Sequence, residues 1–474
     1  MRRLIPWLPP LALGGLVLLL PVPAGLEPAA WRYLALFVFV IAALVTEPLP
    51  GPAIGVLGVS IAAGLGLVKP TPAESVRWAL SGFSNEVVWL VFSATTFALG
   101  YEVTGLGRRI ALTLVAKLGS RTLGLGYAVA LSDLVLSPFM PSNTARSAGT
   151  IYPVVKNIPP LYGSSPTENP RAIGAYLFWV AFATTCLTSS MFVTSQAPNL
   201  LATEMARTIA NVDVTWTGWM LGFLPVGLVL FVLTPLVTYL VYPPAITNGS
   251  RVAGWAATEL GRMGPVSRRE ITMAILATVA LAGWIFGSAF VAAVTVSLIV
   301  ISLMLLTGVV TWNDILSNAA GWNVLVWFST LLALANGLTE VGFIPWFANL
   351  SAARLSMIPE MAAGVGIVSL FFLLHYLFAS TSAHTVAVLP AFLAAVVAFG
   401  SARVTPAVVL MLLYTIGVMG VLTPYGTGPA PVWFHTGYIS TRDFWKLGLL
   451  FGLLYLGGLL LVGFPIALRT TGGT

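Results

Sequence analysis

The sequence predicts an all-α membrane protein with about 11 transmembrane helices, two re-entrant hairpins and two inverted-topology repeats. Three observations support this fold class. The chain of 474 residues is 58% hydrophobic and only 8% charged. Its apolar stretches have the length of membrane spans. A serine-rich polar tip also occurs twice inside apolar segments, 238 residues apart, at 141–146 (PSNTAR) and 379–384 (ASTSAH).

The composition excludes a soluble protein and several kinds of site. A soluble domain carries about 25% charged residues, and the mean hydropathy here is +0.95. The net charge of +7 comes from basic residues in loops between apolar spans, which indicates membrane orientation rather than nucleic-acid binding. The single cysteine, Cys186, excludes a disulfide framework and a cysteine-based metal site, and we interpret it as a small buried residue.

The N-terminus is compatible with two interpretations. Met1-Arg2-Arg3 followed by the apolar run 11–20 resembles a signal peptide, with Val22 and Ala24 before a cleavage site. We expect instead a retained N-terminal helix over 1–29, because an uncleaved helix makes the later topology consistent.

Apolar runs then predict the spans in order. They lie near 5–22, 30–47, 52–68, 85–105, 171–210, 216–242, 270–288, 289–307, 321–341, 403–437 and 441–466. Two further apolar segments, 122–157 and 362–399, each contain one polar tip near the middle. Each is long enough for two half-depth helices, so we expect two re-entrant hairpins whose tips are buried in protein.

Two of the spans are expected to be broken helices. Residues 194–199 (TSQAPN) interrupt the span 171–210, and residues 423–431 (TPYGTGPAP) interrupt the span 403–437. Proline removes a backbone donor and clashes with the preceding turn, and glycine weakens a helix.

A fixed offset of 238 residues relates the two halves. It pairs Asn85 with Asn323, Trp89 with Trp327 and Ser142 with Ser380, and it places His384 opposite Arg146. Single matches between apolar sequences mean little. The shared order of span, amphipathic arm (105–121 and 342–357), hairpin, broken helix and final span carries the argument.

Charge then gives the orientation. With the N-terminus in the cytoplasm, fourteen Lys and Arg residues lie in cytoplasmic segments and seven outside, as the positive-inside rule favours. Each repeat then contains five spans, and an odd number makes the repeats inverted. The predicted division is a first repeat at 30–242, a cytoplasmic linker at 243–269 and a second repeat at 270–474.

The tips carry the predicted binding chemistry. Hydroxyl and amide groups inside a membrane are costly unless they are paired, and helix N-termini attract anions. Serine and threonine in membrane helices often bond back to their own turn, but symmetric placement favours a site for a molecule with a carboxylate at each end. The expected substrate-binding residues are Ser142, Asn143, Thr144, Ser380, Thr381, Ser382 and Thr427. The expected helix-break support comes from Ser195, Gln196, Asn199 and Gly426.

Arg146 and His384 are the predicted cation-replacing or coupling residues. A charge at the bilayer centre costs about 2.5–3.5 kcal/mol, so Arg146 should have a partner. Three roles are open for it: neutralising a substrate carboxylate, filling a cation site with its guanidinium, or snorkelling to the cytoplasm. His384 is either a neutral donor or a protonatable group. Asp133 and His375, in the hairpin arms, are compatible with gating or with a structural role.

These motifs resemble the divalent anion:sodium symporter superfamily, in which a Ser-Asn-Thr motif marks each hairpin tip. Segments 141–146, 195–199 and 423–431 are most similar to its exchanger branch of citrate/succinate and tartrate/succinate antiporters and plastid dicarboxylate translocators. The resemblance implies a homodimer with scaffold and transport domains that work by an elevator mechanism. The second tip departs from the symporter pattern, with Ser380-Thr381-Ser382 in place of Ser-Asn-Thr. In the exchanger branch, a similar basic pair takes the place of sodium.

The predicted function is therefore sodium-independent exchange of di- or tricarboxylates (succinate, malate, 2-oxoglutarate, citrate or tartrate) across a bacterial inner membrane. The alternative is a sodium-coupled dicarboxylate symporter. An intramembrane enzyme would need a catalytic pair or metal cluster, and the spans contain no His, Asp and Glu set at suitable spacing. A channel is disfavoured because hairpin tips at the midplane favour occlusion. No cofactor, metal or nucleic acid is expected, and membrane lipid is an expected partner.

Overall fold

The computed structural model describes residues 5–287, 290–355, 357–398 and 400–470. These residues form helices throughout, without a named β-strand, so the predicted all-helical class is confirmed. Nine of the described helical segments are long and apolar enough to cross a membrane. They are Pro28–Thr46, Glu86–Thr104, Thr122–Phe139, Trp216–Val241, Arg268–Phe286, Ala319–Glu340, Glu360–Leu377, Val404–Leu422 and Thr441–Arg469. Two of these nine, Thr122–Phe139 and Glu360–Leu377, lie in the predicted hairpin segments. Among the shorter apolar helices, Ile5–Leu19, Gly51–Gly64 and Ala293–Leu306 correspond to the predicted spans 5–22, 52–68 and 289–307, and Thr381–Val397 lies in the hairpin segment 362–399.

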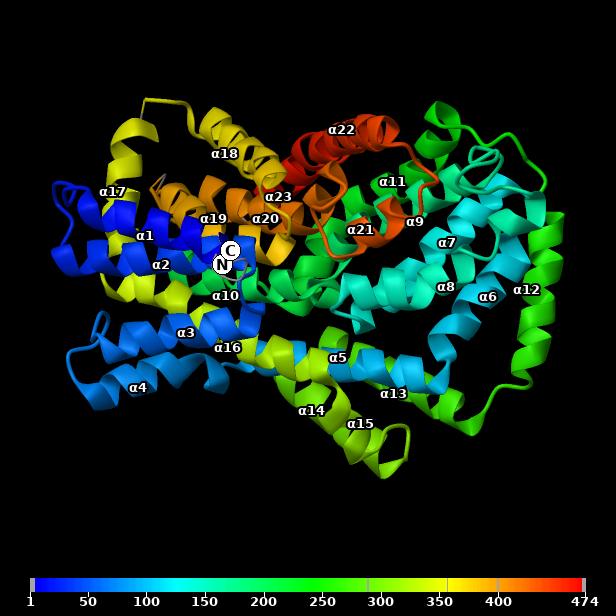
Figure 1. The fold of residues 1–474 in the computed structure, drawn as a ribbon, viewed down its shortest axis with the longest axis horizontal. Helices are drawn as coiled ribbons and strands as arrows, with labels where there is room; N and C mark the ends of the chain where they lie inside the picture. The colour runs from blue at the N-terminus through cyan, green and yellow to red at the C-terminus, as the bar shows by residue number, and fades with distance from the viewer. Residues whose placement is uncertain (1–4, 288–289, 356, 399, 471–474) are drawn as a thin grey trace.

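Two helices of the N-terminal part lie side by side in Figure 1. A 3₁₀ turn, Ile5–Trp7, leads into α1 (Leu8–Leu19), which packs along α2 (Pro28–Thr46). Prolines in the first turns suit helix starts, where the missing N–H has no intrahelical partner. The predicted N-terminal helix is thus shorter than 1–29, and its residues 1–4 lie outside the described part.

In the first half, α4 and α5 begin at capping side chains. Asn85 caps α5 by accepting the Val87 amide N–H at 2.9 Å. Gly105, in the left-handed region with φ 77°, separates α5 from the arm α6, and Gly342, with φ 85°, lies at the corresponding corner before α17. The elements are α3 (Gly51–Gly64), α4 (Pro72–Leu80), α5 (Glu86–Thr104) and α6 (Leu106–Leu118).

The segment 122–157 folds as two helical arms around the first tip. The first arm is α7 (Thr122–Leu136) with a 3₁₀ turn, Ser137–Phe139. The second arm begins as a π-helical segment, Ala145–Ile151, and ends in α8 (Tyr152–Val155). The segment 171–210 contains α9 (Gly174–Met191), a 3₁₀ turn at Val193–Ser195 and α10 (Ala197–Ala210), and α11 (Trp216–Val241) follows.

The predicted linker 243–269 contains a helix of its own, α12 (Ser250–Met263). In Figure 1 it lies along one end of the molecule, and it packs against α6. Ser267 and Glu270 form a capping box at the start of α13 (Arg268–Phe286). The next helices are α14 (Ala293–Leu306), α15 (Trp312–Ser317), α16 (Ala319–Glu340) and α17 (Phe343–Leu355).

The segment 362–399 has the same plan as the first polar tip. It consists of α18 (Glu360–Leu374), a 3₁₀ turn at His375–Leu377 and α19 (Thr381–Val397). The segment 403–437 contains α20 (Val404–Val418), a 3₁₀ turn at Met419–Leu422 and the short α21 (Pro429–Phe434). The chain ends with α22 (Thr441–Gly458), a π-helical segment at Leu459–Gly463 and α23 (Phe464–Thr470).

The helices form two groups that lie one above the other in Figure 1. The lower group contains α3, α4, α5, α13, α14, α15 and α16, with α16 in contact with both α3 and α5. The upper group contains α9, α10, α19, α20, α21 and α22. Its core is where α9 packs against α20, since all 18 residues of α9 are buried.

Each half of the chain contributes to the other half's tip region. The first arms stay with their own half, because α7 packs on α9 and α18 packs on α20. The second arms contact both halves: α19 packs on α10 as well as on α17 and α20, and the π-helical segment 145–151 packs on α21 as well as on α7 and α9. The first polar tip contacts both helix breaks, because the Pro141 carbonyl accepts the Ala197 amide N–H and the Asn143 side chain donates to Thr427.

Candidate functional site

The first tip begins with Ser142, which ends the loop and caps the second arm. Its hydroxyl oxygen accepts the Ala145 amide N–H at 3.1 Å, and its carbonyl accepts the Arg146 amide N–H at 2.9 Å. A serine side chain is well suited to this position because it satisfies a backbone donor that has no intrahelical partner. The cap leaves the hydroxyl hydrogen of Ser142 free to be donated to another group.

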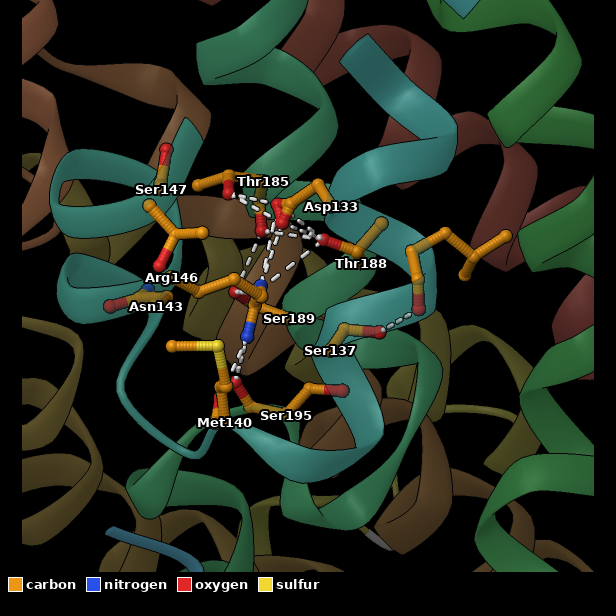
Figure 2. Close-up of polar contacts among 12 residues, drawn as sticks. Asp133, Ser137, Met140, Asn143, Arg146, Ser147, Thr185, Thr188, Ser189 and Ser195 are labelled. Carbon is orange, nitrogen blue, oxygen red and sulfur yellow. Dashed lines mark hydrogen bonds and ion pairs between the residues drawn. The ribbon is translucent and has the colours of Figure 1, made fainter. Parts of the chain in front are cut away.

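Arg146 lies beyond this cap and is completely buried. Figure 2 shows its side chain among residues from both arms of the first tip and from α9. Nε donates to the Asp133 carboxylate at 2.6 Å, which forms an ion pair with side chains 0% and 3% exposed. Asp133 also accepts hydrogen bonds from Thr185 and Thr188. The charge that the sequence left without a partner is therefore neutralised within the hairpin segment itself.

The remaining nitrogens of the guanidinium are also occupied. Nη1 donates to the carbonyls of Met140 and Ser195, at 2.9 and 2.7 Å. Nη2 donates to the hydroxyls of Thr188 and Ser189, at 3.4 and 3.1 Å. Since a guanidinium has five N–H groups, these contacts leave none for a carboxylate ligand. Arg146 ties the first tip to the break between α9 and α10.

The second tip repeats the serine cap. The Ser380 hydroxyl oxygen accepts the Ala383 amide N–H at 3.4 Å, and its carbonyl accepts the His384 amide N–H at 3.0 Å. The correspondence with Ser142 and Arg146 therefore extends to the hydrogen bonds of the backbone.

At the second tip, the basic residue His384 has no acidic partner like Asp133 among the described residues. The offset of 238 residues places Phe371 where the first tip has Asp133, and the Phe371 ring lies 4.5 Å from the His384 ring, centroid to centroid. His384 bonds to His375 instead, with the two Nδ1 atoms 3.1 Å apart, and His375 Nε2 lies 2.8 Å from the Gly426 carbonyl oxygen. A pair of imidazoles thus replaces the Arg–Asp pair of the first tip.

The first helix break is held by amide side chains. The Asn199 side chain donates to the Ser189 and Phe192 carbonyls, at 2.7 and 3.2 Å, at the end of α9. Gln196 donates to Asn199 at 2.8 Å and accepts from Asn143 of the first tip at 3.4 Å. Carbonyls freed by the break are thereby satisfied.

The second break connects the two tips. The Asn143 side chain donates to the Thr427 hydroxyl at 2.9 Å, while the neighbouring residue Gly426 bonds to His375 below the second tip. A side chain at Gly428 would overlap the Thr144 hydroxyl oxygen, so this position has room only for glycine. Adjacent residues of one loop therefore contact different hairpin segments.

Several hydroxyls near the tips remain available. Within the described part of the chain, the hydroxyls of Thr144, Thr381 and Ser382 make no hydrogen bond to another residue, and they are not among the buried unpaired atoms. The hydroxyl hydrogens of Ser142 and Ser380 are also free to be donated, because these side chains only accept in their caps. Hydroxyl donors of this kind can bind the oxygens of an anion.

A different site is unsuited to an anion. A cavity of about 440 Å³ lies between α1, α2, the start of α17 and α19, beside Leu377 and Phe378 of the second hairpin segment. Thr46 supplies its single hydroxyl, and that hydroxyl donates to the Ala42 carbonyl at 2.9 Å. This cavity therefore offers a carboxylate no polar side-chain partner.

Sequence reasoning missed the importance of Asp133 and His375. Both lie in the first arms of the hairpin segments, where gating and structure were left open. The expectation that Arg146 needs a partner could have found Asp133, because a buried acid in the same apolar segment is the obvious candidate. For His375 the available signal was a second basic side chain nine residues before His384.

Known proteins share this sequence and fold. Residues 2–467 match the family described as the sodium:sulfate symporter transmembrane region. The chain is 45% identical over 470 residues to the L-tartrate/succinate antiporter of Escherichia coli K12, covering 96% of each chain. It is also 45% identical over 472 residues to the citrate/succinate antiporter of the same strain, covering 97% of each.

One solved structure is similar in fold. The YdaH transporter of Alcanivorax borkumensis has a TM-score of 0.56 at 16% sequence identity, over 94% of this chain and 99% of that one. The family and these relatives are transporters, so the prediction of a membrane transporter rather than an enzyme is confirmed. The resemblance drawn from the two tips and the two helix breaks is confirmed as well: this chain belongs to the sodium:sulfate symporter transmembrane region family.

Proposed function

We propose that this transporter exchanges di- or tricarboxylates without sodium, with succinate, malate, 2-oxoglutarate, citrate and tartrate as candidate substrates. The two Escherichia coli relatives are named as antiporters of tartrate with succinate and of citrate with succinate. Identity of 45% along nearly the whole chain supports a shared transport reaction.

One observation carries the proposal. Thr427 bonds to the first tip through Asn143, at 2.9 Å, and Gly426 bonds to His375 of the second hairpin segment, at 2.8 Å. Because these are adjacent residues, both hairpin segments contact one loop. A substrate with two carboxylates would be bound at one end by Ser142, Asn143 and Thr144. Its other end would be bound by Ser380, Thr381 and Ser382.

The basic residues support exchange without a cation. A sodium site at the first tip would need oxygen ligands, and the Asp133 carboxylate, two carbonyls (Met140 and Ser195) and the Ser189 hydroxyl already accept from the Arg146 guanidinium. A fixed positive charge among these oxygens repels sodium. Of the roles open for Arg146, its contacts favour filling a cation site over direct binding of substrate.

The conformational part of the proposal is an elevator. We take the hairpin segments 122–157 and 362–399 as re-entrant and the two halves as inverted repeats, with the N-terminus in the cytoplasm of a bacterial inner membrane. The crossed packing of α19 on α10 and of the segment 145–151 on α21 supports a transport unit that moves as one body. The lower helix group of Figure 1 would be the scaffold and would form a homodimer.

Counter-transport in proteoliposomes tests the function. Liposomes loaded with unlabelled succinate should take up labelled succinate equally in sodium and potassium medium, and unloaded liposomes should take up little. Uptake that needs a sodium gradient and ignores internal succinate would instead establish the sodium-coupled symporter that the family name suggests.

A matched pair of variants tests the donor set. Thr144→Ala should raise the half-saturating succinate concentration by about 2–10-fold, the effect expected for one lost hydrogen bond. Thr278→Ala is the control, because its exposed hydroxyl donates only to Ala274 of its own helix. Equal half-saturation in both variants would remove Thr144 from the site.

A further inference from the structure

His375 connects the second tip to the second helix break. Its ring is fully buried, with Nδ1 3.1 Å from Nδ1 of His384 and Nε2 2.8 Å from the Gly426 carbonyl oxygen. His384 itself lies between aromatic rings, with ring centroids 4.5 Å from Phe371 and 4.8 Å from Phe378. Of the two imidazoles, His375 is the one whose hydrogen bond reaches the break.

The hydrogen bonds determine where the protons lie. A carbonyl only accepts, so His375 Nε2 must carry the hydrogen that Gly426 receives. No ion pair between described residues includes either histidine, and a buried imidazolium without a counter-charge is costly. Both rings are therefore neutral, and His384 Nδ1–H donates to the bare Nδ1 of His375.

This arrangement leaves one nitrogen without a partner. His384 Nε2 is buried and makes no hydrogen bond to any residue that the structure describes. The chain of donors thus runs in one direction, from His384 to His375 to the Gly426 carbonyl, and its last step covers an oxygen of the broken helix.

We propose that His375 is a positioning residue that caps the Gly426 carbonyl and so withholds this oxygen from a cation. Carbonyls of unwound helices are typical ligands for coupling ions in transporters. Arg146 covers the Met140 and Ser195 carbonyls in the same way at the first tip. The inference rests on the proposed sodium-independent exchange. It assigns the exclusion of a cation at the second tip to His375 rather than to His384 alone.

Two substitutions separate the contacts of His375. In His375→Gln the amide nitrogen is three bonds from Cβ, like ring Nε2, so it can still donate to Gly426. In His375→Asn the amide is two bonds from Cβ, like Nδ1, so it can meet His384 but cannot cap the carbonyl. The readout is the ratio of succinate counter-transport in sodium to that in potassium medium.

We expect His375→Asn to be stimulated by sodium about 2–10-fold, the range set by the loss of one hydrogen bond. His375→Gln should keep a ratio near that of the wild type. A folded His375→Asn variant without a sodium response would overturn the inference, and so would the same response in both variants.

Gly426→Ala provides a test that keeps both histidines. A Cβ at this position would lie 2.9 Å from His375 Nε2 and 2.8 Å from the Thr423 hydroxyl oxygen, so the imidazole must shift. We expect a sodium-induced rise in the unfolding temperature of the purified variant, and its absence in folded Gly426→Ala protein contradicts the cap. Wild-type protein that fails to exchange without sodium refutes the proposed function itself, whereas intact wild-type exchange with sodium-insensitive variants refutes only the role of His375.

Discussion

Replacing Arg146 by alanine should convert the first tip from a cation-filled site into a cation-binding one. The ion pair with Asp133 is buried on both sides, with side chains 0% and 3% exposed. Removing one partner of such a pair leaves an uncompensated buried charge and costs about 3–5 kcal/mol. Arg146→Ala should therefore lower the free energy of unfolding by about this amount in potassium medium.

Sodium should restore part of the free energy of unfolding that Arg146→Ala loses. The space left by the guanidinium is lined by the Asp133 carboxylate, the Met140 and Ser195 carbonyls and the hydroxyls of α9. Such oxygens are the ligands that hard cations prefer. A cation present at ten times its dissociation constant stabilises the folded state by about 1.4 kcal/mol, so the unfolding temperature of Arg146→Ala should rise in sodium relative to potassium.

Thermal unfolding of detergent-solubilised protein in the two salts measures both effects. The double variant Asp133→Asn/Arg146→Ala has no unpaired buried charge at the first tip, so it should be more stable than Arg146→Ala and should not respond to sodium. Arg262→Ala is the control for a lost ion pair, because Arg262 is 72% exposed and such surface pairs contribute about 0–1 kcal/mol. The reasoning is refuted if Arg146→Ala unfolds with the same free energy as the wild type. It is also refuted if sodium raises the unfolding temperature of the double variant as much as that of Arg146→Ala.

Two further substitutions test the contacts around the breaks. Gly428→Ala should raise the half-saturating succinate concentration at least about fivefold in the transport assay, because the added methyl group must displace Thr144 and overpacking costs about 1–3 kcal/mol. Gly457→Ala is the control in the same assay, because no neighbouring atom lies within 4 Å of its new Cβ. Asn199→Ala should lower the free energy of unfolding by about 1–3 kcal/mol in thermal or denaturant unfolding, because it strips donors from buried carbonyls, whereas Asn157→Ala, which removes an exposed hydrogen bond, should have little effect.

The local features of this protein follow from the sequence. Span-length apolar runs, the polar tips at 141–146 and 379–384, and helix breaks near Pro198 and Gly426 all depend on neighbouring residues, so they can be predicted from the sequence. The serine caps at Ser142 and Ser380 appear only in the structure. The bounds of the helices differ from the predicted ones where the backbone departs from α-helical geometry. The first tip continues into a π-helical segment, Ala145–Ile151, which no pattern of apolar residues would distinguish from an α-helix.

The side-chain partners of the basic residues could not be predicted from the sequence. The sequence indicated that Arg146 must be neutralised and that His384 occupies the equivalent position, but it left the direction of both side chains open. Asp133 reaches Arg146 because the two arms fold back on each other, and His375 reaches Gly426 because α18 packs along α20.

The sequence by itself thus determined a helical membrane protein, the positions of its polar tips and breaks, and its transporter family. Only the tertiary structure decided what each basic group contacts, because a hydrogen bond between residues 51 apart (His375 and Gly426) or 284 apart (Asn143 and Thr427) depends on how helices pack. Hydropathy and capping are properties of neighbours along the chain, whereas the neutralisation of a buried charge depends on neighbours in space.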